Sequence, residues 1–233
     1  MDFRDRYVVV TGGAGALGGA VVGALLEAGA VCHVPCRTQD EAQRFSYRGH
    51  AAVKLVAPIE LGDEAAVARL YQSVPKLWAS IHVAGGFTAA AIEETGKAEL
   101  MRQIETNLVS AFLCCRAAVK AMGDGGGGGR IVNVAARPAL EWRTGAGMTA
   151  YTASKAAVAA LSAALAEEVA KRGILVNAVA PSIMDTPQNH AAMPKADHAK
   201  WPKVEEVAAT ILFLASPENK VSRGAIVPVY GKS

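Results

Sequence analysis

Aromatic residues and cysteine are scarce in this sequence, and its charges are few and scattered. Aromatic residues make up 6% of the 233 residues, and charged residues make up 19% with a net charge of +3. Because like charges form no block, nothing supports a nucleic-acid or membrane-surface partner, and we expect a small-molecule ligand. The four cysteines lack zinc-site spacing, so we expect buried thiols and no metal; they are Cys32, Cys36, Cys114 and Cys115.

Long apolar runs are also missing. The longest apolar stretches are shorter than a membrane span, and strand-like residues begin by Tyr7, which leaves no room for a signal peptide. We therefore expect a cytoplasmic protein. A chain of this length with 52% hydrophobic residues suits one buried core, so we expect residues 1–233 to form a single domain. We interpret the glycine-rich run 123–129 as a flexible surface loop rather than a domain boundary.

Apolar, β-branched runs alternate with helical patterns along the whole chain. Strands that do not alternate in polarity, each followed by a helix, predict an α/β fold with a Rossmann-type doubly wound parallel sheet of about seven strands. The predicted strands are 7–10, 31–35, 52–56, 80–83, 130–134, 174–178 and 225–229, and the predicted helices are 18–28, 63–73, 97–122, 150–171 and 204–215. Residues 181–201 show no clear periodicity, and we interpret them as a substrate lid.

A glycine-rich turn, Thr11-Gly12-Gly13-Ala14-Gly15-Ala16-Leu17-Gly18, joins the first predicted strand to the first helix. Glycine allows positive φ and close approach of a ligand to the backbone, and the helix N-terminus carries a positive dipole. The turn therefore predicts a site for the phosphates of a dinucleotide.

A second motif lies far downstream, where Tyr151 and Lys155 are four residues apart on a predicted helix. At this spacing the phenol and the ammonium share one face and can act on the same atom. A nearby cation favours the phenolate, so we expect Lys155 to lower the pKa of Tyr151.

Together these motifs resemble the short-chain dehydrogenase/reductase family over essentially the whole chain. The resemblance implies that Asn107, Tyr151 and Lys155 are catalytic, that Lys155 holds the ribose hydroxyls of the cofactor, and that Tyr151 donates a proton as hydride leaves the nicotinamide. The family's catalytic serine is missing, because the strand 131–134 continues into Ala135-Ala136-Arg137. Thr144 and Thr149 are the alternatives for its hydroxyl, and the sequence does not choose between them.

Two smaller departures concern the cofactor turn and the fourth strand. Ala16 stands at the middle glycine of the family's turn, which narrows the cradle by a methyl group. His82-Val83 replaces the usual paired asparagines, and we expect His82 to be a hydrogen-bonded core residue.

A narrower, local resemblance is to the dihydropteridine reductases, which also lack the serine. It rests on the turn 15–18, on Phe87 after Val83-Ala84-Gly85-Gly86, and on the stretch from Asp185 to Trp201. Against it, Asn107 resembles carbonyl-reducing relatives, and the stretch 213–216 resembles bacterial oxoacyl reductases.

These resemblances and the local chemistry give a set of candidate site residues. We expect cofactor contacts from Gly12, Gly15, Ala16, Leu17, Gly18, Arg37, Thr38, Glu60, Leu61, Ala84, Gly85, Tyr151, Lys155, Pro181, Ile183 and Thr186. We expect substrate contacts from Phe87, Ala136, Trp142 and Met184. NADP(H) is favoured over NAD(H), because the neutral Cys36 ends the second strand and Arg37 can meet a 2′-phosphate. The dihydropteridine reductase resemblance favours NADH instead.

The leading hypothesis is an NADP(H)-dependent oxidoreductase that transfers hydride to a small carbonyl or conjugated imine, with Tyr151 as proton donor. One alternative is dihydropteridine reductase itself. Another is a dinucleotide-sensing protein that lost its chemistry with the serine. From kinship and the small side chains at Ala156, Ala160, Ala163 and Ala164, we expect a homodimer or homotetramer formed through the helices that contain Asn107 and Tyr151.

Overall fold

Seven parallel strands form the centre of the protein, in the order β3-β2-β1-β4-β5-β6-β7. The computed structural model describes residues 1–124 and 127–233; residues 125 and 126, part of the run interpreted as a loop, lie outside the described residues. The strands are β1 (Tyr7–Thr11), β2 (Val31–Pro35), β3 (Val53–Val56), β4 (Leu77–His82), β5 (Gly129–Val134), β6 (Ile174–Pro181) and β7 (Ile226–Val229). This order confirms the doubly wound, Rossmann-type sheet.

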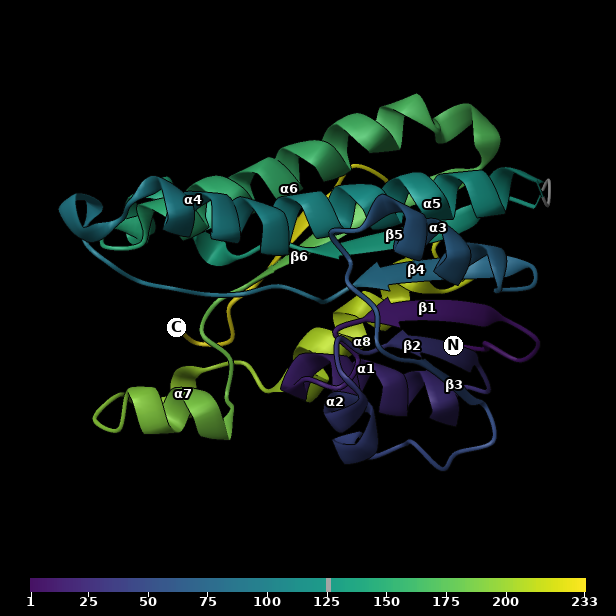
Figure 1. Cartoon of the computed structure of the whole chain (residues 1–233), viewed down its shortest axis with the longest axis horizontal. Coiled ribbons are helices and arrows are strands. Elements are labelled where there is room, and N and C mark those ends of the chain that lie inside the picture. Colours follow the sequence, from purple (N-terminus) through teal and green to yellow (C-terminus); the bar gives the residue numbers. More distant parts are fainter. Residues whose placement is uncertain (125–126) are drawn as a thin grey trace.

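Helices cover both faces of the sheet, with α1 and α8 on one side and α3, α5 and α6 on the other (Figure 1). The helices are α1 (Ala16–Glu27), α2 (Gln39–Arg44), α3 (Glu64–Gln72), α4 (Lys97–Gln103), α5 (Ser110–Asp124), α6 (Thr149–Glu168), α7 (Pro187–Ala192) and α8 (Val204–Ala215). Within the described residues, no helix has the length and apolar character needed to cross a membrane.

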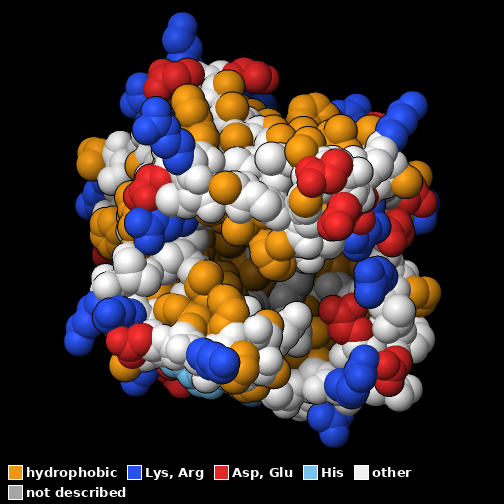
Figure 2. Space-filling model, turned by 90° about the vertical axis from the view of Figure 1, so that its left-hand side faces the viewer, with side chains coloured by type: hydrophobic (Ala, Val, Ile, Leu, Met, Phe, Trp, Pro, Cys, Tyr) orange, Lys and Arg blue, Asp and Glu red, His pale blue; other side chains and the backbone are white. Residues whose placement is uncertain are grey.

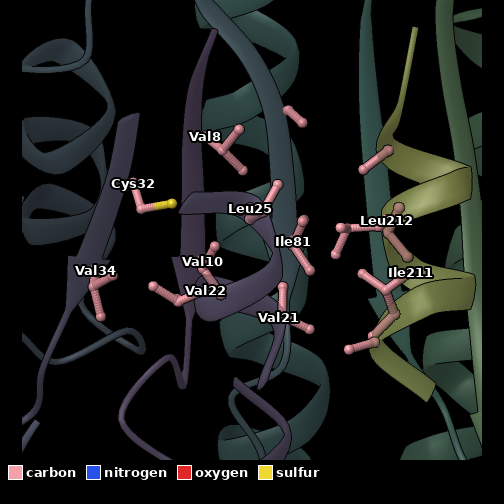
Figure 3. Close-up of a cluster of buried hydrophobic side chains, with 14 of the residues drawn as sticks. Val8, Val10, Val21, Val22, Leu25, Cys32, Val34, Ile81, Ile211 and Leu212 are labelled. Atoms are coloured by element: carbon pink, nitrogen blue, oxygen red, sulfur yellow. The ribbon is translucent and has the colours of Figure 1, made fainter. Parts of the chain in front are cut away.

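The core explains why the strands read as continuous apolar runs. Val8, Val9 and Val10 of β1 are all fully buried, because helices pack on both faces of the sheet. On one face, side chains of α1 such as Val22 and Leu25 meet those of β1, β2 and β4, and α8 adds its own apolar side chains (Figure 3). All four cysteines are buried thiols, as predicted.

Apart from shifts of up to three residues at the ends of predicted strands and helices, the α-helices differ from the prediction at three places. Two short helices, α2 and α7, were missed, and α7 lies inside the segment predicted to have no periodic structure. Each has six residues, which is too short for a hydrophobic period to show. The long predicted helix 97–122 is interrupted between α4 and α5 by a π-helical turn, Ile104–Val109. Such a turn inserts extra backbone without changing the residue types, and it often marks a functional position.

All strands point the same way, so their carboxyl ends meet on one side of the molecule. That side carries the start of α4, the helix α7 and the chain's carboxyl terminus (Figure 1). Seen from there, the surface has a central hollow rimmed by hydrophobic side chains (Figure 2). In open parallel sheets, ligands bind beyond the carboxyl ends of the strands, so the site is sought at this hollow.

Candidate active site

The glycine-rich turn folds tightly between β1, α1 and the end of β4. Gly12 has a φ of +66°, and a Cβ built on it would lie 2.6 Å from the backbone nitrogen of Ala84. A Cβ on Gly18 would collide with the carbonyl oxygen of Gly12. These two glycines are therefore required by packing, whereas a Cβ on Gly15 would meet only the oxygen of Gly12 at 3.4 Å.

The N-terminus of α1 has the properties that an anion needs. Its N-cap, Gly15, supplies no capping side chain, and the first turn contains no acidic residue. The first backbone N–H groups of a helix have no partner within the helix, and together with the helix dipole they attract negative charge. Ala16 lies exposed at this end, while the side chain of Leu17 is buried in the core, so Leu17 can offer a ligand only its backbone. The residues present fit a dinucleotide phosphate.

The residues that follow β2, which are the candidates for contact with the adenosine ribose, differ in exposure. Cys36 is buried, whereas Arg37 and Thr38 are exposed. The hydroxyl of Thr38 accepts the N–H of Glu41 at 3.1 Å and so caps α2. The carboxylate of Glu41 in turn accepts the backbone N–H of Arg37 at 2.6 Å. Sequence reasoning missed this acid; the signal was the spacing of a threonine and a glutamate three residues apart, which is typical of a capping box.

The remaining predicted cofactor residues lie beyond neighbouring strands. Ala84 and Gly85 follow β4, and the N–H of Ala84 donates to the hydroxyl of Thr11 at 3.3 Å, which ties the end of β4 to the turn. Glu60 is exposed and Leu61 is partly buried. Pro181 is the buried last residue of β6. Beyond it, Ile183 is exposed, Met184 is partly buried against the core, and Thr186 caps α7 by accepting the N–H of Asn189 at 3.2 Å.

Tyr151 and Lys155 lie on the first turns of α6. The ammonium of Lys155 is 6% exposed and donates to the carbonyl oxygen of Val134 at 2.8 Å. Burial lowers its pKa from 10.5 to about 8. The ring of Phe87 meets Tyr151 edge-on, with ring centroids 4.9 Å apart and an interplanar angle of 87°.

The expected lowering of the Tyr151 pKa is wrong for this structure. Burial raises the pKa of Tyr151 from 10.0 to about 12. The same burial disfavours the charged form of Lys155, so the cation that was expected to stabilise a phenolate is itself weakened. Tyr151 is thus held as a neutral phenol, which is the form that can donate a proton.

Asn107 lies in the π-helical turn, and both ends of its amide bond neighbouring groups. Its Oδ1 accepts the backbone N–H of Gly86 at 2.9 Å. Its Nδ2 donates to the carbonyl oxygen of Gly86 at 3.0 Å, to Gln103 Oε1 at 3.1 Å and to Ser154 Oγ at 3.1 Å. A Cβ on Gly85 would lie 2.7 Å from Asn107 Oδ1, so a glycine is needed there for this approach. In this geometry Asn107 positions the loop after β4.

The comparison with known proteins now decides the family. Residues 6–197 match the family model described as short chain dehydrogenase. The chain belongs to the short-chain dehydrogenase/reductase family. It is therefore an NAD(P)-dependent oxidoreductase, and these matches give no support to the alternative of a non-catalytic sensor.

Relatives and solved structures of this family resemble the chain along its full length. It is 35% identical to cis-4-hydroxycyclohexanecarboxylate dehydrogenase of Sinomonas cyclohexanicum, over 98% of this chain and 96% of the relative. It is 30% identical to the (2S)-[(R)-hydroxy(phenyl)methyl]succinyl-CoA dehydrogenase subunit BbsD of Thauera aromatica, over 99% of this chain and 97% of the relative. A short-chain type dehydrogenase/reductase from Mycobacterium ulcerans superposes with a TM-score of 0.90 at 25% identity, covering 100% of this chain and 90% of that one.

Among the family's expected site residues, the serine position stands out. Ala136 follows β5 and is 6% exposed, and it has no hydroxyl to offer a substrate. The hydroxyl of Thr144 donates to the carbonyl oxygen of Glu141 at 2.8 Å, so it is already used in its own short turn. Thr149 is exposed at the start of α6. Neither threonine is shown to replace the serine.

Two further residues complete the description of the site. Trp142 is 73% exposed, and its Nε1 donates to the carbonyl oxygen of Ala139 at 3.1 Å. Ser154 was missed by the sequence reasoning although it stands between the two chosen residues of α6. It is buried, accepts from Asn107 and donates to the carbonyl oxygen of Tyr151 at 2.8 Å, so it joins Asn107 to the turn that carries Tyr151.

His82 behaves as expected from the sequence. It is buried, with Nδ1 2.7 Å from Asn133 Oδ1 and Nε2 2.7 Å from Ser80 Oγ. Burial lowers its pKa from 6.5 to about 4, so it is neutral in the core. It belongs to the frame of the sheet and is not part of the chemistry.

Proposed function

We propose that this short-chain dehydrogenase/reductase transfers hydride between NADP(H) and a small carbonyl or conjugated imine, with Tyr151 donating the proton. The observation that carries this proposal is the pairing of Tyr151 and Lys155 on one turn of α6. As the neutral phenol, Tyr151 supplies a proton to the substrate oxygen or nitrogen in reduction and becomes the phenolate; in oxidation the phenolate takes the proton from the alcohol or amine.

The other residues of the site hold the reactants in this proposal. The glycine-rich turn and the N-terminus of α1 hold the cofactor's phosphates. Lys155 holds its ribose hydroxyls, which gives the buried ammonium further hydrogen-bond acceptors. The bound nicotinamide supplies or accepts the hydride. Asn107 acts indirectly, by holding the loop that carries Phe87.

The preference for NADP(H) rests on Arg37. It is exposed two residues after the end of β2, at a position from which a guanidinium can pair with a 2′-phosphate, and the preceding Cys36 is neutral and buried. The carboxylate of Glu41 beside the Arg37 backbone opposes this preference, because it places negative charge near the same site. We propose that Arg37 outweighs Glu41, since the carboxylate is already used at the N-terminus of α2.

Dihydropteridine reductase activity is a second candidate, favoured by the edge-on contact between Phe87 and Tyr151 at 4.9 Å. A flat pterin ring needs a proton donor with an aromatic wall beside it, and a conjugated ring can be reduced without the serine's hydrogen bond. The two relatives described above are named instead for secondary alcohols on or beside a ring, whereas another relative is named galactitol 2-dehydrogenase, for an open-chain polyol.

The test is the Tyr151→Phe variant, with Tyr7→Phe as its control at the amino end of β1. NADPH oxidation is followed with quinonoid dihydropterin, cyclohexanone and an oxoacyl thioester, and NADPH binding is followed by fluorescence. We expect Tyr151→Phe to lose turnover and keep cofactor binding, while the control keeps both. Turnover retained in Tyr151→Phe contradicts the proposal, and pterin turnover alone promotes the second candidate.

We also propose a homodimer or homotetramer that buries the long helices. On α6, Ala160, Ala163 and Ala164 are exposed side by side, and their small side chains allow another helix to approach closely. Light scattering of the purified protein tests this, and a monomer at micromolar concentration contradicts it.

A further inference from the structure

The loop after β4 is held by one helical segment on both sides of Phe87. On one side, Asn107 binds both backbone polar groups of Gly86, at 2.9 and 3.0 Å. On the other side, Arg102 Nη2 donates to the hydroxyl of Thr88 at 2.9 Å. Phe87 lies between these two attachments, so the direction of its backbone is fixed from α4 and the π-helical turn.

The two attachments are also joined to each other. Glu99 accepts hydrogen bonds from Arg102 Nε at 2.9 Å and from Gln103 Nε2 at 3.0 Å. Gln103 Oε1 accepts from Asn107 at 3.1 Å, so the chain of bonds runs from Thr88 through Arg102, Glu99 and Gln103 to Asn107. Gln103 is 2% exposed, and both ends of its amide have partners. We call these four residues, Glu99, Arg102, Gln103 and Asn107, the loop clamp.

The clamp gives an exposed ring an ordered position. Phe87 is 60% exposed, yet its ring stands edge-on to Tyr151 at 4.9 Å. A substrate must bring its reacting atom within hydrogen-bond reach of the Tyr151 hydroxyl, at about 2.6 to 3.2 Å. Groups next to the reacting atom then lie beside the Phe87 ring, where an aromatic face or edge contacts a flat or alicyclic ring over more area than it contacts a flexible chain.

We propose that Phe87, positioned by the loop clamp, is a specificity-determining residue that selects substrates in which the reacting carbon belongs to a ring or adjoins one. The inference rests on the proposed role of Tyr151, since the substrate is placed by that hydroxyl. The clamp residues are positioning residues: they contact the loop, and Phe87 contacts the substrate.

The test compares cyclohexanone with hexan-2-one, which have the same number of carbons, using the full-length protein and NADPH. The variants are Phe87→Ala, Arg102→Ala and Thr88→Val, with Arg102→Lys as a conservative rescue. Arg116→Ala is the matched control. Arg116 lies on α5, farther along the same helical run as Arg102, and its exposed guanidinium pairs with Glu64 of α3 instead of with the loop. Urea unfolding of each variant verifies that it is folded.

In wild type we expect a clear preference for cyclohexanone in kcat/KM. Phe87→Ala should reduce the ring-to-chain ratio about tenfold, mainly through the KM for cyclohexanone. Arg102→Ala and Thr88→Val should reduce the ratio by about threefold to fivefold with little change in kcat for hexan-2-one, Arg102→Lys should restore part of it, and the control should leave it unchanged. A merely structural role would lower kcat for both ketones alike.

A binding measurement separates this inference from the proposed function. With NADP⁺ bound, which has no hydride to donate to a ketone, calorimetry on the protein that keeps Tyr151 gives the affinity for each ketone without turnover. Equal affinities for the two ketones, or a ratio that Phe87→Ala leaves unchanged, overturn the role of Phe87. If the ratio of the two ketone affinities changes in Phe87→Ala but not in Arg102→Ala, the loop clamp does not position Phe87. Failure of the proposed function shows itself separately, as turnover retained in Tyr151→Phe.

Discussion

Replacing Lys155 by methionine should make the protein more stable at neutral pH while removing cofactor binding. Burial lowers the pKa of Lys155 from 10.5 to about 8. Each pKa unit corresponds to about 1.4 kcal/mol, so the folded state holds the protonated ammonium at a cost of roughly 3 kcal/mol. Losing the hydrogen bond to Val134 offsets about 1 kcal/mol of this, which leaves an expected gain of roughly 2 kcal/mol for Lys155→Met.

The pH dependence gives the prediction its sign. Below pH 8 both the folded and the unfolded states bind the Lys155 proton, so the cost is present in full. Between pH 8 and 10.5 the folded state releases the proton first, and the unfolding free energy therefore rises with pH. Tyr151 acts in the opposite direction above pH 10, because its pKa is raised to about 12 and the unfolded state ionises first. The buried thiols act in the same direction as Tyr151 from about pH 9, because burial raises the pKa of Cys36 to about 11 and the pKa values of Cys32, Cys114 and Cys115 to about 12. The contribution of Lys155 is therefore the difference in unfolding free energy between wild type and Lys155→Met between pH 8 and 10, in which the thiols cancel.

Urea unfolding followed by circular dichroism at pH 7, 8, 9 and 10 measures the effect. We expect Lys155→Met to be more stable than wild type at pH 7, and we expect this difference in unfolding free energy to shrink as the pH rises from 8 to 10. Lys120→Met is the control, because Lys120 is exposed on α5. A variant that is less stable than wild type at pH 7, or that keeps the wild-type slope, refutes the reasoning from burial.

Three other changes test separate parts of the structure. Burial lowers the pKa of His82 to about 4, so the stability that its neutral ring contributes is present in full above pH 6.5 and is lost as the pH falls toward 4. Urea unfolding at pH 4.5 and 7 should therefore show a smaller change in unfolding free energy with pH for His82→Asn than for wild type. Glu41→Gln should strengthen the binding of NADPH relative to that of NADH by about threefold to tenfold, because it removes a carboxylate beside Arg37. Fluorescence titration measures both affinities, and an unchanged ratio of NADPH to NADH affinity counts against a 2′-phosphate site at Arg37. Ala136→Ser should raise kcat/KM for hexan-2-one by about tenfold if its hydroxyl reaches the substrate oxygen, and unchanged steady-state kinetics would show that it does not.

The sequence was sufficient for the features that depend on local pattern. The buried strands lack polar alternation, so their approximate number and parallel direction followed from the pattern, and the turn 11–18 and the Tyr151–Lys155 spacing followed from residue identity. Predictions failed where distant segments meet. The pKa of Tyr151 depends on its burial rather than on sequence spacing, the role of Asn107 depends on a π-helical turn, and Glu41 became visible only once α2 was in place.

Ala136, at the family's serine position, and the hydrogen-bonded amide of Asn107 both bear on how the substrate is oriented. In this family the substrate oxygen is expected to meet a serine and a tyrosine, but Ala136 offers no hydroxyl and the amide of Asn107 is spent on Gly86, Gln103 and Ser154. A single hydrogen bond to Tyr151 fixes a distance and leaves the substrate free to rotate about it. Hydride transfer also needs the reacting carbon to be oriented toward the nicotinamide. In the arrangement proposed here that orientation comes from shape, because the Phe87 ring is held against Tyr151 by bonds on both sides of it. In this proposal a packed contact with Phe87 takes the place of a hydrogen bond from a serine, and a packed contact favours rigid rings over flexible chains.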